Sequence, residues 1–255
     1  MSSLLRPAIK RQRQTERYGD LSRQPLYILV FLLPLLLFYE LALLRMRGSS
    51  GGVTIKAHAA LVRFLEIADM PLTGGLWLGG IAVATILLLW HVFAGFPWRI
   101  RPRVPAIMAA ESITFALPLL AIGSLLMGAI QPAASGSSVA ELGMVNRIAI
   151  SIGAGIYEEL LFRMMIIGGV HSVLCSLLRQ SERWGIGIAV GVSAVAFAWY
   201  HDLPSPGTMP ALRLVFYGTA GLYLALIYVT RGFGIAAGAH AAYDIVATAM
   251  VPLPE

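Results

Sequence analysis

The sequence predicts an all-α membrane protein, built as a polytopic bundle of about seven (six to eight) transmembrane helices. The first reason is composition: of 255 residues, 58% are hydrophobic and only 13% are charged, about half of the roughly 25% usual in soluble domains. The second is a mean hydropathy of +0.76, because a soluble chain of this length could not bury so much apolar surface. Together they exclude an ordinary soluble enzyme, a disordered chain and a nucleic-acid-binding domain.

The expected spans are apolar runs of about the length that crosses a bilayer at 1.5 Å per residue. The first follows a polar N-terminal segment and is too long for the core of a signal peptide, so we expect it to be retained. The spans are expected at residues 25–44, 74–96, 108–130, 145–170, 184–200, 212–230 and 235–251.

Three regions are expected along the chain. Residues 1–24 are a basic tail, predicted to be cytoplasmic because Lys and Arg in the short loops favour that side. Residues 25–144 hold the N-terminal transmembrane helices, with an amphipathic or re-entrant link at 45–73. Residues 145–251 form a C-terminal helical core. This distribution explains the net charge of +6 as a topology signal, so the charge says little about partners. The apolar composition predicts the lipid bilayer as a partner and no nucleic acid.

The expected span 145–170 breaks the rule that ionisable residues avoid hydrocarbon. It contains Glu158, Glu159 and Arg163, and such groups are functional-site candidates because their burial is costly. Glu159 and Arg163 are four residues apart on a helix and can form an ion pair. Glu158 points about 100° away around the helix, so it needs a histidine, a metal ion or a water-filled cleft. Alternatively, both glutamates belong to a structural polar network between helices.

Two later spans carry histidines at helical spacing. Phe197 and His201 are four residues apart near the end of the fifth span, and His240 and Asp244 are four apart inside the last. An aspartate that receives an imidazole N–H fixes the tautomer of that histidine. Because His201 lies nearer to a span end than Glu158 does, its helix must tilt or shift for the two to meet. Pairs of small residues that permit close helix approach occur on the same helices: Ser151/Gly155, Gly187/Gly191 and Gly234/Gly238.

Convergence of Glu158, His201 and His240 would give a recognisable chemistry. A glutamate and histidines in a low-dielectric cleft can deprotonate a water for attack on a carbonyl, while a second polar pair holds the oxyanion. Hydrolysis of a peptide bond is the natural reaction class. The chain has no H-E-x-x-H motif, which excludes the arrangement of soluble zincins. Cys175, the only cysteine, lies between expected spans without a neighbouring base and is expected to be a small packing residue.

The three motifs together resemble the CPBP family of CAAX proteases and bacteriocin-processing enzymes, also called the Abi family. Its patterns are E-E-x-x-x-R, F-x-x-x-H and H-x-x-x-N/D on successive transmembrane helices. The resemblance covers about residues 145–251, under half of the chain, and identifies this part as a CAAX-protease-like catalytic core. The matching segments are Glu158-Glu159-Leu160-Leu161-Phe162-Arg163, Phe197-Ala198-Trp199-Tyr200-His201 and His240-Ala241-Ala242-Tyr243-Asp244.

The resemblance implies a glutamate-dependent intramembrane endopeptidase, usually classed as a metalloprotease. Glu158 would be the catalytic glutamate that activates water, aided by His201. Glu159 and Arg163 would be the supporting ion pair, and Phe197 would support the site. The implied substrate is a protein or peptide that enters from the membrane, either membrane-associated or lipid-anchored.

The last motif carries one departure from the family pattern. His240 and the residue at 244 would polarise the carbonyl or hold the oxyanion, and the family often has Asn where this chain has Asp244. An ionised carboxylate repels an oxyanion, so Asp244 must be protonated, orient His240 or bind a metal ion. The third option keeps zinc open as a cofactor, with four candidate ligands: Glu158, His201, His240 and Asp244.

Two other functions fit the same residues. One is a non-catalytic immunity or scaffold protein of the same fold, whose function would survive Glu158→Gln. The other is a proton-coupled transporter that uses Glu158, Glu159 and Asp244 as relay sites. Transporters often have pseudo-symmetric halves, and the sequence has no such repeat.

Overall fold

The computed structural model describes residues 17–47, 78–127, 143–201 and 210–250, and it has helices and turns but no strand in these ranges. The all-α prediction is therefore confirmed. Most of the predicted basic tail (1–16) and of the predicted link (48–73) lies outside the described residues.

Each predicted span coincides with a helix. Five described helices are long and apolar enough to cross a membrane, judged by length and composition, and Gly79–Phe93 is a shorter apolar helix. The elements are α1 (Tyr18–Leu21), α2 (Pro25–Arg47), α4 (Leu78–Phe93), α5 (Arg103–Met127), α7 (Met144–Glu159), the π-helical η1 (Leu160–Ile167), α8 (Gly168–Ser172), the π-helical η2 (Val173–Leu177), α9 (Glu182–His201), α10 (Pro210–Arg231) and α11 (Phe233–Ala249).

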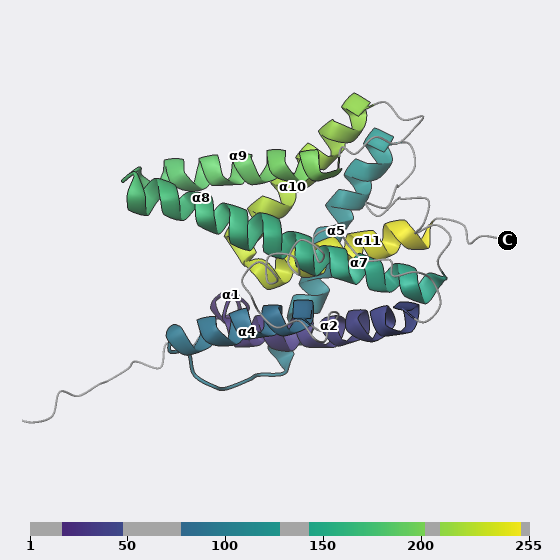
Figure 1. Cartoon of the computed structure of the whole chain (residues 1–255), viewed down its shortest axis with the longest axis horizontal. Helices are drawn as coiled ribbons and strands as arrows, with labels where there is room; N and C mark the ends of the chain where they lie inside the picture. Colours follow the sequence, from purple (N-terminus) through teal and green to yellow (C-terminus); the bar gives the residue numbers. More distant parts are fainter. Residues whose placement is uncertain (1–16, 48–77, 128–142, 202–209, 251–255) are drawn as a thin grey trace, which may run out of the picture.

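Helix α11 lies at the centre of the bundle and organises the others (Figure 1). It packs against α7, α5, α10 and α2, and most of its 17 residues are buried. Because protein surrounds it, this short helix does not need to present a full membrane-spanning length to lipid. The chain from α7 to η2 is one continuous helical run of 34 residues, and its far end lies beside α9 as a hairpin (Figure 1).

Small residues let the central helices approach closely. A Cβ on Gly155 would lie 2.5 Å from the backbone nitrogen of Ala241, and one on Gly238 would lie 2.4 Å from a serine Oγ of α5. Two of the three expected small pairs thus lie at tight helix contacts. The third expectation was wrong: a Cβ on Gly187 or Gly191 would meet no described atom within 4 Å, because both lie on an exposed face of α9.

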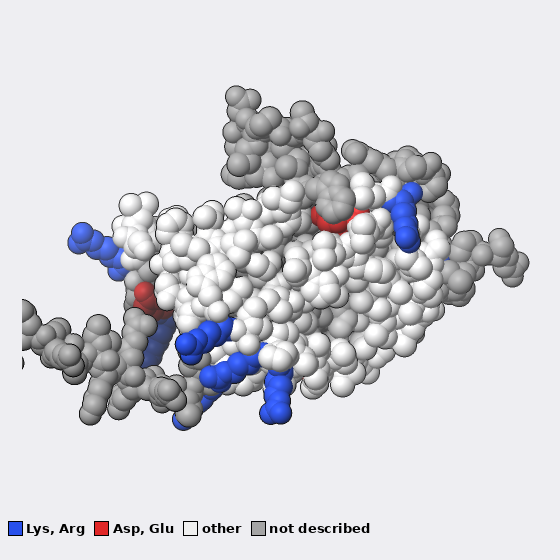
Figure 2. All heavy atoms as spheres, turned by 90° about the horizontal axis from the view of Figure 1, so that it is seen from below, with Lys and Arg blue, Asp and Glu red and all other residues white. Residues whose placement is uncertain are grey.

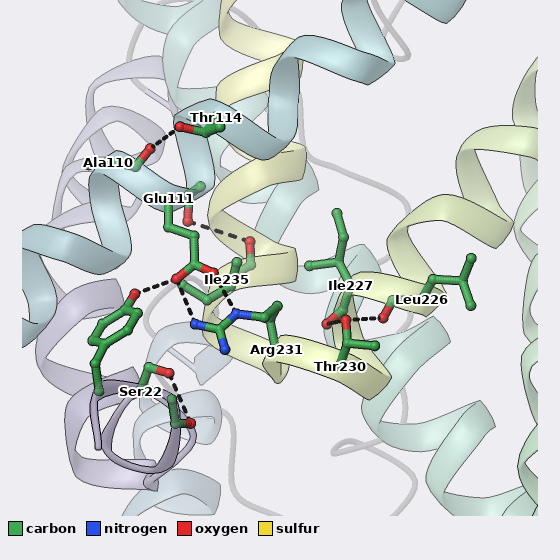
Figure 3. A network of polar contacts seen from close by, with 12 residues as sticks. Ser22, Ala110, Glu111, Thr114, Leu226, Ile227, Thr230, Arg231 and Ile235 are labelled. Atoms are coloured by element: carbon green, nitrogen blue, oxygen red, sulfur yellow. Dashed lines mark hydrogen bonds and ion pairs between the residues drawn. The ribbon is translucent and has the colours of Figure 1, made fainter. Parts of the chain in front are cut away.

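Glu111 joins three elements at one end of the bundle. Figure 3 shows its carboxylate on α5 facing the guanidinium of Arg231, with an Nη2–Oε2 distance of 2.9 Å. The Tyr18 hydroxyl of α1 donates to the same carboxylate. Burial, together with this carboxylate, raises the pKa of the Tyr18 phenol. The sequence alone gave no role to Glu111, whose partners are 93 and 120 residues away.

Glu40 of α2 is buried next to the C-terminal core. Its Oε1 accepts hydrogen bonds from the Tyr157 hydroxyl and from the backbone N–H of Gly80, each 3.0 Å long. Tyr157 directly precedes Glu158 in α7. The N-terminal helices α2 and α4 are thereby tied to the part of α7 that carries the paired glutamates.

The surface suits a lipid environment. On the face in Figure 2, uncharged residues dominate and the Lys and Arg side chains lie toward the margins. Large apolar side chains are widely exposed, for example Phe93, Leu125 and Trp199 at 84%, 83% and 78%. Monomeric proteins in water rarely expose so extensive an apolar surface.

We expect Gly155→Ala to destabilise the bundle, because its Cβ would collide with the Ala241 backbone. The free energy of unfolding should fall by about 1–3 kcal/mol, as measured by SDS-induced or thermal unfolding in detergent. Gly187→Ala is the matched control, since its Cβ meets no described atom within 4 Å and alanine favours a helix. Equal stability of the two variants would contradict the close α7–α11 contact.

Candidate active site

The paired glutamates lie at the end of α7, deep in the protein. Glu158 and Glu159 are 4% and 0% exposed. Directly after them the helix widens into η1, which carries Arg163. Such π-helical turns are rare and often occur at functional sites. The sequence pattern did not predict this widening.

The Glu159 carboxylate bridges a guanidinium and an imidazole. Its Oε2 lies 2.9 Å from Nε of Arg163, and its Oε1 lies 2.9 Å from Nδ1 of His240. The first contact is the expected i,i+4 ion pair. The second was not predicted, because 81 residues separate Glu159 from His240. The carboxylate therefore connects α7 and η1 to α11, and its two partners offset the cost of burial.

Arg163 is held by α9 as well. Its Nη1 donates to Oγ of Ser193 over 3.2 Å, and that hydroxyl donates to the Phe162 carbonyl over 2.8 Å. The guanidinium also lies 4.8 Å from the ring centre of Phe197, a cation–π distance. We did not predict a role for Ser193 from the sequence, although its spacing indicates one. Ser193, Phe197 and His201 follow one another at intervals of four residues and lie on one face of the helix.

Glu158 has a histidine partner from α9. Its Oε2 lies 3.3 Å from Nε2 of His201, while Nδ1 of His201 donates to the Phe197 carbonyl over 2.8 Å. The imidazole is stacked against the ring of Tyr217 at 4.4 Å and 18°. Nε2 is therefore fixed toward Glu158. Nothing in the sequence distinguished Tyr217 from the other tyrosines.

The second acid–histidine pair lies on α11. Nε2 of His240 is 3.6 Å from Oδ2 of Asp244, and within the described part of the chain neither carboxylate oxygen of Asp244 has a hydrogen-bond partner. The Phe197 ring contacts both imidazoles, with centroid distances of 4.4 Å to His201 and 5.8 Å to His240. The predicted site residues of α7, η1, α9 and α11 thus meet in one buried cluster.

A comparison with protein-family models identifies part of the chain. Residues 140–246 match the family model described as type II CAAX prenyl endopeptidase Rce1-like. The resemblance to CAAX proteases is confirmed over this region. Neither a curated protein nor a solved structure matches the chain. The match supports a protease of the CAAX family, and together with five apolar helices it indicates an integral membrane protein.

The donor types in this CAAX-protease-like site suit zinc, but their arrangement does not. Glu158 and His201 form one pair and His240 and Asp244 another, with distances of 3.3 and 3.6 Å. No three of these four residues place ligand atoms within 4.8 Å of one another. Nδ1 of His240 is moreover engaged by Glu159. These residues therefore do not form the compact tetrahedral ligand set that zinc requires.

We expect Glu159→Gln to destabilise the protein strongly. Removing one partner of a buried ion pair leaves the others uncompensated, which costs about 3–5 kcal/mol of unfolding free energy. SDS-induced unfolding of the purified protein measures the loss. Asp20→Asn, which removes an exposed carboxylate in α1, should change stability by less than about 0.5 kcal/mol. A Glu159→Gln variant as stable as Asp20→Asn would show that the bridge contributes nothing.

Proposed function

We propose that the protein is an intramembrane endopeptidase that hydrolyses peptide bonds of membrane-associated or lipid-anchored proteins. One observation carries the proposal: Glu158 and His201 form a buried pair, 3.3 Å apart, within the region that matches CAAX endopeptidases. A carboxylate and an imidazole at this spacing can both contact one water molecule. Burial excludes bulk water, so each polar contact with the reacting groups is stronger than at a surface.

Glu158 acts as the general base. It accepts a proton from the bound water, whose oxygen attacks the carbonyl carbon of the scissile peptide. His201 cannot turn freely, because Nδ1 is held by the Phe197 carbonyl and the ring is stacked on Tyr217. Its Nε2 therefore positions the water and the carboxylate. When the C–N bond breaks, Glu158 returns the proton to the leaving amine, so one water is consumed for each bond cut.

His240 stabilises the oxyanion. Its two nitrogens face carboxylates, Glu159 at 2.9 Å and Asp244 at 3.6 Å, and an ionised carboxylate can only accept hydrogen bonds. With a proton on each nitrogen, Nδ1 donates to Glu159 and Nε2–H is directed at Asp244. The looser contact, between Nε2 and Asp244, is the one that a developing oxyanion can replace. Asp244 orients the imidazole in this mechanism and does not contact the oxyanion.

The partners follow from the position of the cluster among apolar helices. A peptide or protein segment enters from the membrane, and the lipid bilayer is the second partner. The cytoplasmic placement of the N-terminus is part of the proposal and rests on the Lys and Arg distribution in the loops.

We expect Glu158→Gln and His201→Ala to lower the cleavage rate by about 10²–10⁴-fold, the usual contribution of general acid–base catalysis. The assay follows cleavage of prenylated peptides with a CAAX-type C-terminus by the purified protein in lipid vesicles. Asp20→Asn is the control and should cleave at the unaltered rate. Full cleavage by either site variant, with the fold verified by its unfolding curve, would contradict the proposed roles. A scaffold protein would keep its function in Glu158→Gln.

We expect cleavage to survive removal of divalent metal ions, because the mechanism uses only protein side chains. The rate after exhaustive treatment with a zinc chelator should stay within about twofold of the untreated rate, a change of about 0.4 kcal/mol in the barrier. Loss of cleavage on chelation that added zinc restores, and that also occurs in a Cys175→Ser variant, would instead place a metal ion in the reaction.

A further inference from the structure

A second cluster of metal-ligating side chains lies at the closed end of the α8–α9 hairpin. His171, Cys175 and Glu182 place one ligand atom each within 4.8 Å of one another, the one such group of His, Cys, Asp and Glu in the described ranges. Glu182 begins α9 and His201 ends it, so the cluster is about 28 Å along the helix from the catalytic histidine. The proposed protease mechanism does not use it.

A short chain reversal, closed by backbone hydrogen bonds, holds these three residues together. His171 and Cys175 are four residues apart, on one side of α8 and η2. Two backbone hydrogen bonds close the turn. The N–H of Leu178 donates to the Val173 carbonyl over 3.0 Å, and the N–H of Gln180 donates to the Leu174 carbonyl over 2.9 Å. Arg179 has a φ of +53°, a conformation that reverses the chain and is uncommon for a non-glycine residue. The reversal brings Glu182 to the same place.

Gly185, one turn into α9, leaves room for the cluster. A Cβ at this position would lie 2.3 Å from Sγ of Cys175 and 3.5 Å from Cδ2 of His171. Any other residue would displace the thiol. The α9 backbone can therefore come close to Cys175 only because residue 185 has no side chain.

We propose that His171, Cys175 and Glu182 bind a zinc ion. A thiolate, an imidazole and a carboxylate are the three ligand types that zinc takes from proteins. Nε2 of His171 lies 2.9 Å from Oε2 of Glu182, near the roughly 3.3 Å between adjacent ligands of a tetrahedral zinc ion. The Glu182 side chain is 81% exposed, so an ion can enter from solvent and a water completes the fourth position.

Bound zinc would clamp the closed end of the hairpin. One arm is continuous with α7, which carries Glu158, and the other is α9, which carries His201. The ion thus fixes the relative position of the two arms at the end opposite to the catalytic pair. Its role is structural, and it takes no part in the peptide hydrolysis.

Cobalt titration of the full-length, metal-stripped protein in detergent tests the proposal. Cys175 is the only cysteine in the chain, so a thiolate-to-cobalt charge-transfer band reports this site alone. We expect the band to saturate at one ion per chain and to disappear on addition of equimolar zinc. Cys175→Ser should abolish the band, and His171→Ala should weaken cobalt binding at least tenfold. Ser172→Ala, an exposed neighbour, is the matched control and should bind like the unaltered protein.

Two further variants test whether Glu182 is a ligand and whether the metal site is separate from the catalytic pair. Glu182→Gln alters an exposed side chain and should weaken binding several-fold while the band persists. The variant His201→Ala, which alters the proposed catalytic pair, should keep the band and the affinity unchanged. Absence of the band in the unaltered protein, saturation only at millimolar cobalt, or equally tight binding by Cys175→Ser would each overturn the proposal.

Discussion

The buried carboxylate of Glu159 is the interaction on which the rest of the site depends. It is fully buried and contacts the guanidinium of Arg163 and the imidazole of His240, each at 2.9 Å. A charge in this position is tolerated only when it is paired on both sides. The pairing fixes three elements at once: α7, the π-helical η1 and α11. Glu158, the next residue back along the chain, is thereby turned toward α9, where His201 completes the second pair.

This bridge requires that the helix backbones come close enough for short contacts. Gly155 lies one turn before Glu159 on α7 and meets α11 at Ala241, one residue after His240. A larger residue at 155 would push α11 outward, and the contact between Glu159 and His240 would lengthen with it. Lipid provides no hydrophobic force between helices, so packing of small residues and polar contacts must hold them together. The glycine and the carboxylate thus act at the same crossing.

The sequence predicted what depends on local patterns and missed what depends on distant partners. Apolar runs located each long helix of the described residues, although not the short α1. The i,i+4 spacing located the contacts of Glu159 with Arg163 and of His240 with Asp244. The contact of Glu159 with His240, the stacking of Tyr217 on His201 and the roles of Glu111 and Glu40 join residues far apart in sequence. No periodicity encodes them. The prediction for Gly187 and Gly191 failed for the opposite reason: the local pattern is present, but no atom of the described helices lies within 4 Å of a Cβ at either position.

The charge balance of the cluster explains why an aspartate can occupy position 244. Glu158, Glu159 and Asp244 bring three carboxylates, and Arg163, His201 and His240 bring one guanidinium and two imidazoles. Three carboxylates thus face three basic side chains, whereas an asparagine at 244 would leave two carboxylates for the same three basic side chains in a buried site. Matched numbers of acidic and basic groups lower the cost of burying the cluster. In the proposed mechanism, the oxyanion takes the His240 N–H, and the Asp244 carboxylate remains as the counter-charge for the imidazole.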